Sequence, residues 1–177
     1  MDNEHFLKID DEMLDFLEKQ AEVLINDLNE SRKRNKDKAI VLFNLLLSGS
    51  GGAFLLWSTN ELPHYLGLAV LLISVLWGIT AIYLLINSIS LKMRPALGNS
   101  PGNLYLPLYQ NFDEYQDWLK AKNIAHLTPT GIMRRFELCN LNQTINDLAQ
   151  DNKKQVQHMN RAMYIAAMIP LLGLLIA

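Results

Sequence analysis

Three stretches of the chain lack charged side chains and alternate with strongly polar segments. The first covers residues 39–57 and would extend about 28 Å as a helix, close to a hydrocarbon thickness of about 30 Å. The second covers residues 65–86, and Pro63 just before it is typical of a helix start. The third lies within residues 161–177, after Arg161. This pattern predicts an all-α integral membrane protein with a two-span helical hairpin and a third C-terminal span.

The polar segment before the first span, residues 1–38, contains a helical repeat. Its apolar positions step by three and four, as in a coiled coil: Leu14, Leu17, Ala21, Leu24 and Leu28. Acidic residues begin the segment and basic residues end it, which complements the helix dipole. We expect an amphipathic helix from about Asp11 to Lys33, and the pattern allows it to continue into the first span.

A second repeat of threes and fours follows Thr128, which can cap a helix that carries Pro129 in its first turn. We call its positions the C-terminal seam: Leu138, Leu141, Ile145, Leu148, Asn152, Gln155, Met159, Ala162, Ala166 and Ile169. Because the repeat does not break, it predicts one helix of about 45 residues that continues into the third span. Asn152 and Gln155 either fix the register of a helix pair or face water beside a bend.

The remaining part of the polar region 92–160 is less regular. Glycines and prolines between Pro95 and Asn103 predict a loop and a hinge. Asn111 and Glu114 have the spacing of a capping box, which predicts a short helix that ends near Lys122. The aromatic residues here are Tyr105, Tyr109, Phe112, Tyr115 and Trp118. They suit a helix in the lipid headgroups, but mixed charges favour packing against the other cytosolic helices.

Basic residues predict the orientation, because they gather on the cytosolic side of spans. They precede the first span, follow the second and precede the third, whereas the connector 58–62 has none. The N-terminus is therefore expected in the cytoplasm and the C-terminus outside. Trp57 and Tyr65 flank the external turn as interfacial anchors. Recognition of an anionic lipid is the alternative function of the basic cluster.

Small and weakly polar residues make the spans themselves the best candidate site. In the first span Asn44, Ser48 and Gly51 or Gly52 share one helix face. The second span offers Ser74, Gly78 and Asn87. Such residues either pack helices closely or line a water-filled path in an oligomer. The absence of charge argues against an ion pump or a proton-coupled carrier, but not against a wide or dewetting pore.

Composition excludes several kinds of chemistry. Sixteen basic residues against eighteen acidic ones leave no basic excess for direct nucleic-acid binding. The single cysteine, Cys139, allows no intrachain disulfide and is expected to be a small helix residue. Four scattered histidines offer no spaced metal ligands, and His158 is expected to be a surface residue. We therefore expect no enzyme activity, no cofactor and no metal.

The two repeats offer surfaces for pairing with each other or with neighbouring copies. The positions from Leu138 to Met159 are accordingly candidates for an oligomer interface. Two functions fit: an oligomer that forms or gates a pore, or a non-conducting scaffold that docks a cytosolic protein partner to the membrane.

In its layout the chain resembles small membrane effectors of bacterial antiphage systems, namely the SLATT-like proteins and the membrane accessory proteins of some CRISPR systems. The helix from Leu14 to Leu28, the hairpin around residues 58–62 and the helix after Pro129 carry this resemblance. The resemblance implies the bacterial inner membrane and a partner-triggered change in membrane permeability. The additional span after Arg161 departs from the two-span pattern.

Overall fold

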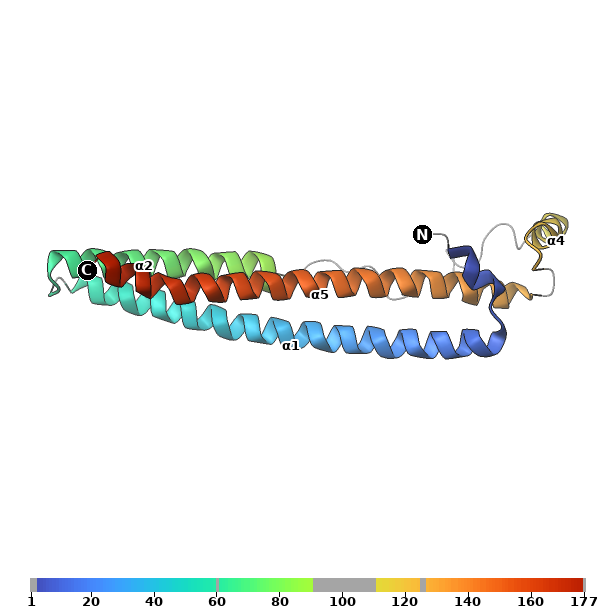
Figure 1. Ribbon diagram of the computed structural model, residues 1–177, viewed down its shortest axis with the longest axis horizontal. Helices are drawn as coiled ribbons and strands as arrows, with labels where there is room; N and C mark the ends of the chain where they lie inside the picture. Colours follow the sequence, from blue (N-terminus) through green and yellow to red (C-terminus); the bar gives the residue numbers. More distant parts are fainter. Residues whose placement is uncertain (1–2, 60, 91–110, 125–126, 177) are drawn as a thin grey trace. The chain divides into compact units, whose positions relative to one another are not determined.

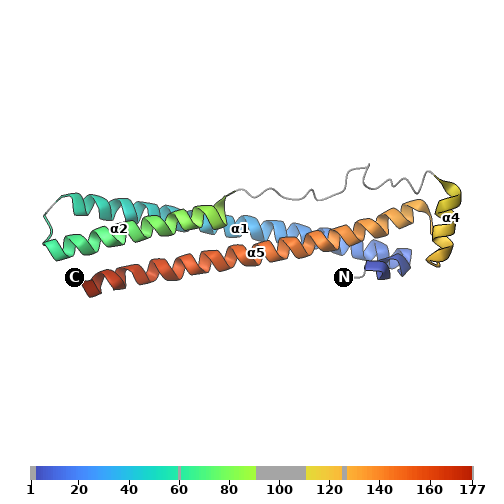
Figure 2. The ribbon, with the colours of Figure 1, turned by 90° about the horizontal axis from the view of Figure 1, so that it is seen from above.

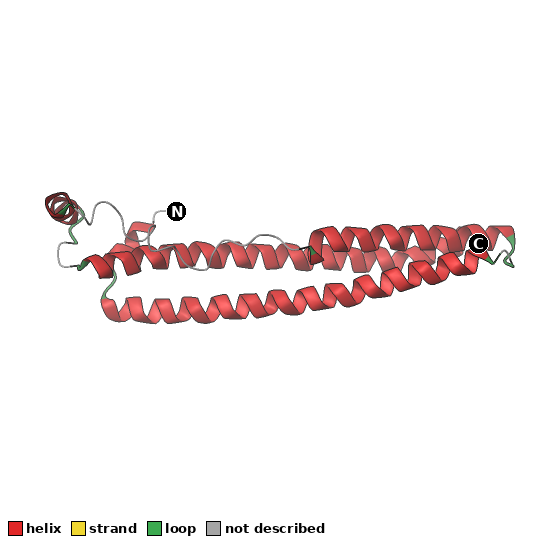
Figure 3. Ribbon diagram, turned by 180° about the vertical axis from the view of Figure 1, so that it is seen from behind, coloured by secondary structure: helices red, strands yellow, loops and turns green. Residues whose placement is uncertain are grey.

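A computed structural model describes residues 3–59, 61–90, 111–124 and 127–176, in which every element is a helix (Figures 1 and 3). The elements are the 3₁₀ helix η1 (Asn3–Lys8), α1 (Asp11–Ser58), α2 (His64–Leu84), the π-helix η2 (Leu85–Ile89), α4 (Phe112–Ala121) and α5 (Pro129–Ile176). The all-α prediction is therefore confirmed for the described residues. The predicted hinge at Pro95–Asn103 and the aromatic residues Tyr105 and Tyr109 lie outside them.

Two helices of 48 residues each, α1 and α5, confirm the predicted long helices. The Asp10 carboxylate accepts a 2.7 Å hydrogen bond from the Met13 backbone N–H at the start of α1. At the start of α5, the Gly131 N–H donates to Thr128 Oγ1 at 3.1 Å, as the sequence predicts. The helix α5 continues through Pro170.

The chain divides into two compact units, and α1 and α5 contribute to both. Unit 1 comprises Met1–Asn29 and Met93–Ala149, and unit 2 comprises Glu30–Lys92 and Gln150–Ala177.

The core of unit 1 joins the first half of α1 to the first half of α5. Leu14 and Ala21 of α1 are buried against Leu138 of α5, the first position of the C-terminal seam. The α1 repeat is wrong at one position, because Leu24 is 44% exposed whereas Ile25 is only 6% exposed. A straight α-helix drifts by about 20° per heptad relative to a 3.5-residue repeat, so the buried face passes from Leu24 to its neighbour.

The short helix α4 packs within unit 1, which favours the packing interpretation of its aromatic residues. Tyr115 and Leu119 form a second buried cluster with Ile124 and Ile132. The capping-box prediction is wrong in detail, since the Asn111 side chain makes no cap hydrogen bond to the backbone. Its amide instead donates to the Glu114 carboxylate at 3.1 Å, because two side chains three residues apart on this exposed start are within reach of each other.

Two consecutive arginines of α5 fasten α5 to the start of α1 in unit 1. The Arg135 side chain is almost fully buried and donates to the backbone carbonyl of Ile9, to Asp11 and to the carbonyl of Gly131. Arg134 is partly exposed and pairs with Asp15 and Glu18. The hydrogen bond from Arg134 lowers the pKa of Asp15 below its ordinary value of 3.8.

Unit 2 packs three helical segments together, as seen from above in Figure 2. Its buried cluster consists of Leu46 of α1, Ala81 and Leu84 of α2, and Ala162 of α5. Pro63 precedes α2 and adopts extended backbone angles, in agreement with the predicted helix start.

Two of the described helices are long and apolar enough to cross a membrane: Asp11–Ser58 and His64–Ile89. Only 11% and 28% of the most apolar 18-residue segment of each helix is buried within the structure. A core helix of a soluble protein, in contrast, is mostly buried. Over its described residues, the helix α5 is not one of these two, so the third span stays a prediction.

We predict that replacing Arg135 loosens the start of α1. Arg135→Leu should lower the free energy of local opening of residues 11–29 by about 2–3 kcal/mol, because two backbone carbonyls lose a charged donor. Hydrogen exchange followed by mass spectrometry measures this change. Arg134→Leu removes a more exposed pair and serves as the control, with an effect below about 1 kcal/mol. Equal protection in both variants would contradict the assigned role of Arg135.

A second prediction concerns acid. Because Arg134 lowers the pKa of Asp15, this pair stabilises the folded unit above pH 3.8, and the contribution disappears as the pH falls through the lowered pKa. Thermal unfolding followed by circular dichroism between about pH 2 and pH 6 should show a flatter acid decline for Asp15→Asn than for the parent chain. Parallel curves for the two proteins would refute the prediction.

Candidate functional site

A reciprocal pair of hydrogen bonds joins the two helices of the predicted hairpin. Ser50 Oγ on α1 donates to the Ser74 carbonyl at 2.8 Å, and Ser74 Oγ on α2 donates to the Ser50 carbonyl at 2.8 Å. A Cβ atom at Gly78 would lie 3.3 Å from Ser50 Oγ, so this glycine also lies at the contact. Ser74 and Gly78 therefore pack the two helices against each other. We call this the serine contact.

Trp77 completes the packing around the serine contact. Its indole Nε1 donates to the Ala166 carbonyl of α5 at 3.1 Å, which fixes the ring. The ring lies against Gly49, where an added Cβ would approach Trp77 Cζ3 to 2.6 Å. A single side chain thus bridges all three helices of unit 2, and only a residue without a Cβ fits opposite it.

The other candidate residues of the first span lie on the opposite, exposed face of α1. Asn44, Ser48, Gly51 and Gly52 are all exposed, and a Cβ at either glycine would meet nothing within 4 Å. We call these four residues the outward stripe. They share one face as predicted, and within the described part of the chain that face is exposed. The candidate set therefore divides into an internal contact and an external surface.

Polar side chains gather where α2 passes into the π-helix η2. Tyr83 Oη and His158 Nδ1 are 2.6 Å apart, and the Gln155 amide donates to the Ser88 carbonyl at 2.9 Å. The candidate residue Asn87 donates to the Tyr83 carbonyl at 2.9 Å. A π-helical turn redirects backbone carbonyls from the α-helical pattern and is frequent at functional sites. We call this group of residues the polar node.

The polar node includes a small cavity of about 20 Å³, large enough for one water molecule. Its lining comprises Arg32, Asn87, Ser88, Ser90, Asp151 and Gln155. Ser88 Oγ and Gln155 Oε1 are buried and make no hydrogen bond within the described part of the chain. The node can therefore accommodate water between η2 and α5.

Two sequence expectations are settled by the polar node. Asn152 is only 7% exposed and Gln155 donates to a carbonyl of η2, so the interpretation in which both face water beside a bend is wrong. His158 was expected at the surface but is half-buried against Tyr83, because a partner 75 residues earlier lies beside it.

All described positions of the C-terminal seam are buried or half-buried within their units. Their use between copies stays a prediction.

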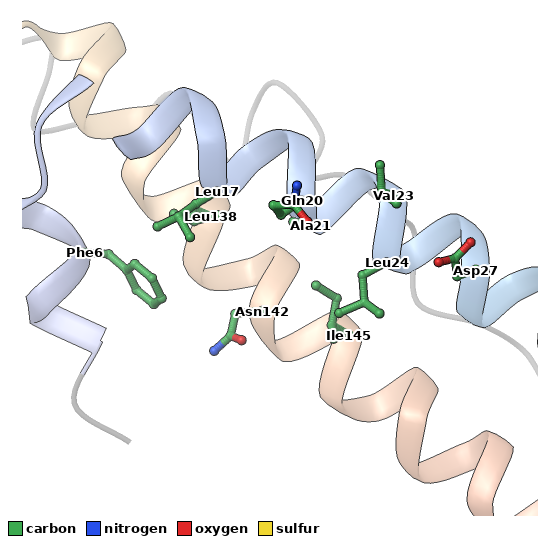
Figure 4. A pocket seen from close by; sticks show the side chains of 10 residues that line it. All are labelled: Phe6, Leu17, Gln20, Ala21, Val23, Leu24, Asp27, Leu138, Asn142 and Ile145. Atoms are coloured by element: carbon green, nitrogen blue, oxygen red, sulfur yellow. The ribbon is translucent and has the colours of Figure 1, made fainter. Parts of the chain in front are cut away.

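Unit 1 contains an apolar groove between α1 and α5, shown in Figure 4. It encloses about 330 Å³, within the range of small ligand sites. The groove is lined by Phe6, Leu17, Gln20, Ala21, Val23, Leu24, Asp27, Leu138, Asn142 and Ile145. Figure 4 shows Leu24 of α1 turned toward Ile145 of α5 and Phe6 reaching in from η1. We refer to it as the apolar groove.

The described side chains are suited to binding and packing. Among them, no group of three His, Cys, Asp or Glu is arranged to hold a metal ion. Burial raises the pKa of the Cys139 thiol, which disfavours the reactive thiolate. Cys139 lies within α5, as expected of a small helix residue.

The sequence pattern does not single out several residues of these sites. It places Ser48 and Ser50 on different helix faces but does not say which face is inside, so it does not identify Ser50. Tyr83 and Ser88 pair with residues far away in the chain, which no local pattern reveals. The arginine pair had a usable signal, because Arg134 and Arg135 are opposite in charge to the acidic start of α1.

Comparison with known protein families, curated proteins and solved structures finds no match to this chain.

We predict that Gly49 and Gly52, which lie about one helical turn apart, differ in their tolerance of an added methyl group. Gly49→Ala should lower the free energy of unfolding by about 1–3 kcal/mol, because the Trp77 ring is held by its bond to Ala166 and cannot withdraw. Gly52→Ala should instead raise it by up to about 1 kcal/mol, because alanine favours the helix and its Cβ meets no atom within 4 Å. Reversible unfolding in mixed micelles measures both values. Equal losses would mean that the close approach of Trp77 to Gly49 does not limit packing.

Proposed function

We propose that the protein is an oligomeric membrane protein that forms or gates a pore, or otherwise perturbs membrane permeability. The observation that supports this most is the outward stripe, which places Asn44 and Ser48 on an exposed face within an apolar stretch. A polar amide facing hydrocarbon is unfavourable unless protein or water replaces the lipid there. Copies of α1 arranged in a ring would turn this face away from lipid and toward a water-filled centre.

The exposure of apolar side chains supports the membrane location. Large apolar side chains are exposed on every segment of unit 2, for example Leu55 at 67%, Ile86 at 60% and Leu174 at 75%. Ser50 and Ser74, in contrast, make their hydrogen bonds to each other inside the protein. This arrangement suits lipid as the surrounding solvent, since polar groups there must find partners within the protein. The basic residues then orient the N-terminus toward the cytoplasm and the C-terminus toward the periplasm.

The chemistry of the outward stripe sets the kind of pore. In a ring of protomers, Asn44, Ser48 and the two glycines would give an uncharged lining. Such a lining provides little ion selectivity, because selective pores need rings of charged side chains or ordered carbonyls, and this lining has neither. The proposed activity is therefore an unselective leak. Its setting as an antiphage effector in a bacterial inner membrane rests on the resemblance of the layout alone.

A scaffold without conductance is the second candidate, and the apolar groove favours it. The groove belongs to unit 1 and is open to a ligand or a partner. In this function the spans anchor the chain, and unit 1 docks a cytosolic protein.

Leakage from reconstituted vesicles separates these two functions. We expect the parent chain to release a small dye. Ser48→Leu or Gly52→Leu should reduce the release at least tenfold, because a bulky side chain fills the stripe. Val75→Leu, at a position of α2 that is 52% exposed, is the matched control and should leak normally.

Two outcomes would contradict the pore. One is the absence of leakage at every protein density, and the other is a strict monomer by native mass spectrometry from bilayers. Leakage that Val75→Leu reduces as strongly as Gly52→Leu would place the path elsewhere.

A further inference from the structure

The charges of the chain are distributed very unevenly. Residues 1–29 contain nine acidic and two basic residues, whereas the whole chain has nearly equal numbers of each. Most of these acidic residues lie on α1 in unit 1, the helix that forms one wall of the apolar groove. Three acidic residues of this helix already pair with α5, since Arg135 binds Asp11 and Arg134 binds Asp15 and Glu18.

Asp27 differs from Asp15 and Glu18 because it lines the apolar groove. No described ion pair involves its carboxylate. Gln20 of α1 and Asn142 of α5 add amide groups to the same lining. The groove thus combines an apolar floor with an acid and two amides.

The groove has the dimensions of a helix-binding surface. From Leu17 to Asp27 its α1 wall rises about 15 Å, or about three turns. Amphipathic helices bind such grooves through apolar residues spaced three and four apart. Leu24 remains 44% exposed and Val23 56% exposed, so both can still bury surface against a partner.

From this combination we infer that the apolar groove binds a basic amphipathic helix of a partner protein. The apolar face of that helix lies on Leu17, Leu24 and Ile145, and a lysine or arginine at one end pairs with Asp27. An acidic helix is rejected by the charge of α1. This inference does not depend on conductance, because binding and leakage are measured separately.

A photo-crosslinking experiment tests the inference on the full chain in nanodiscs of zwitterionic lipid. The probe is a model helix of about four turns with leucine on one face and lysine on the other, carrying a benzophenone among the leucines. A matched peptide has glutamate in place of lysine, and empty nanodiscs measure binding to lipid. We expect the basic peptide to crosslink to groove residues, with affinity that falls as salt is raised.

Two pairs of variants sharpen the test. Asp27→Asn should weaken binding of the basic peptide about two- to fivefold, whereas Glu22→Gln, an exposed acid outside the groove, should leave it unchanged. Leu24→Asn should weaken binding about tenfold. Met13→Asn is its control, because Met13 is 47% exposed and does not line the groove.

Three results would overturn the inference. The first is equal binding of the acidic and basic peptides. The second is crosslinking outside the groove or between copies of the chain, which would assign the groove to another occupant. The third is equal weakening by Asp27→Asn and Glu22→Gln. Failure of leakage with intact peptide binding would reject the pore and leave this inference standing.

Discussion

Buried polar side chains of unit 2 find their partners inside the protein, and the helix faces that carry these side chains are the faces that meet. Ser50 and Ser74 satisfy each other across α1 and α2, and Trp77 donates to a carbonyl of α5. Leu46, Ala81, Leu84 and Ala162 are buried beside these hydrogen bonds, whereas many other large apolar side chains of unit 2 are exposed. Both units therefore combine a buried leucine and alanine cluster with hydrogen bonds between helices, and the arginines supply those bonds in unit 1.

The period of the apolar residues predicted the long helices well, because a helix repeats regularly along its own sequence. It located the start of α1 near Asp11 and the cap of α5 at Thr128, and it identified the buried face of α5. It was wrong at Leu24, where a repeat of 3.5 residues and a helix of 3.6 residues per turn diverge.

The candidate site could be predicted only in part. The sequence identified small polar residues in both spans, but Ser74 proved internal and Ser48 external. Which face of a helix is inside depends on partners far away in the chain. Gly49 and Gly52 illustrate this, because only the packed position of Trp77 distinguishes them. The contact between Tyr83 and His158 is likewise a property of the assembled helices.

The π-helix η2 has a consequence for the backbone carbonyls of its own turn. A π-helical turn holds one residue more than the regular hydrogen-bonding pattern needs, so one position among Leu85–Ile89 is in effect an insertion. The wider turn absorbs that extra residue, so deleting it would restore the α-helical ladder within Leu85–Ile89 without turning the residues on either side. The position of the Ser88 carbonyl that accepts from Gln155 is thus set by a one-residue difference in length.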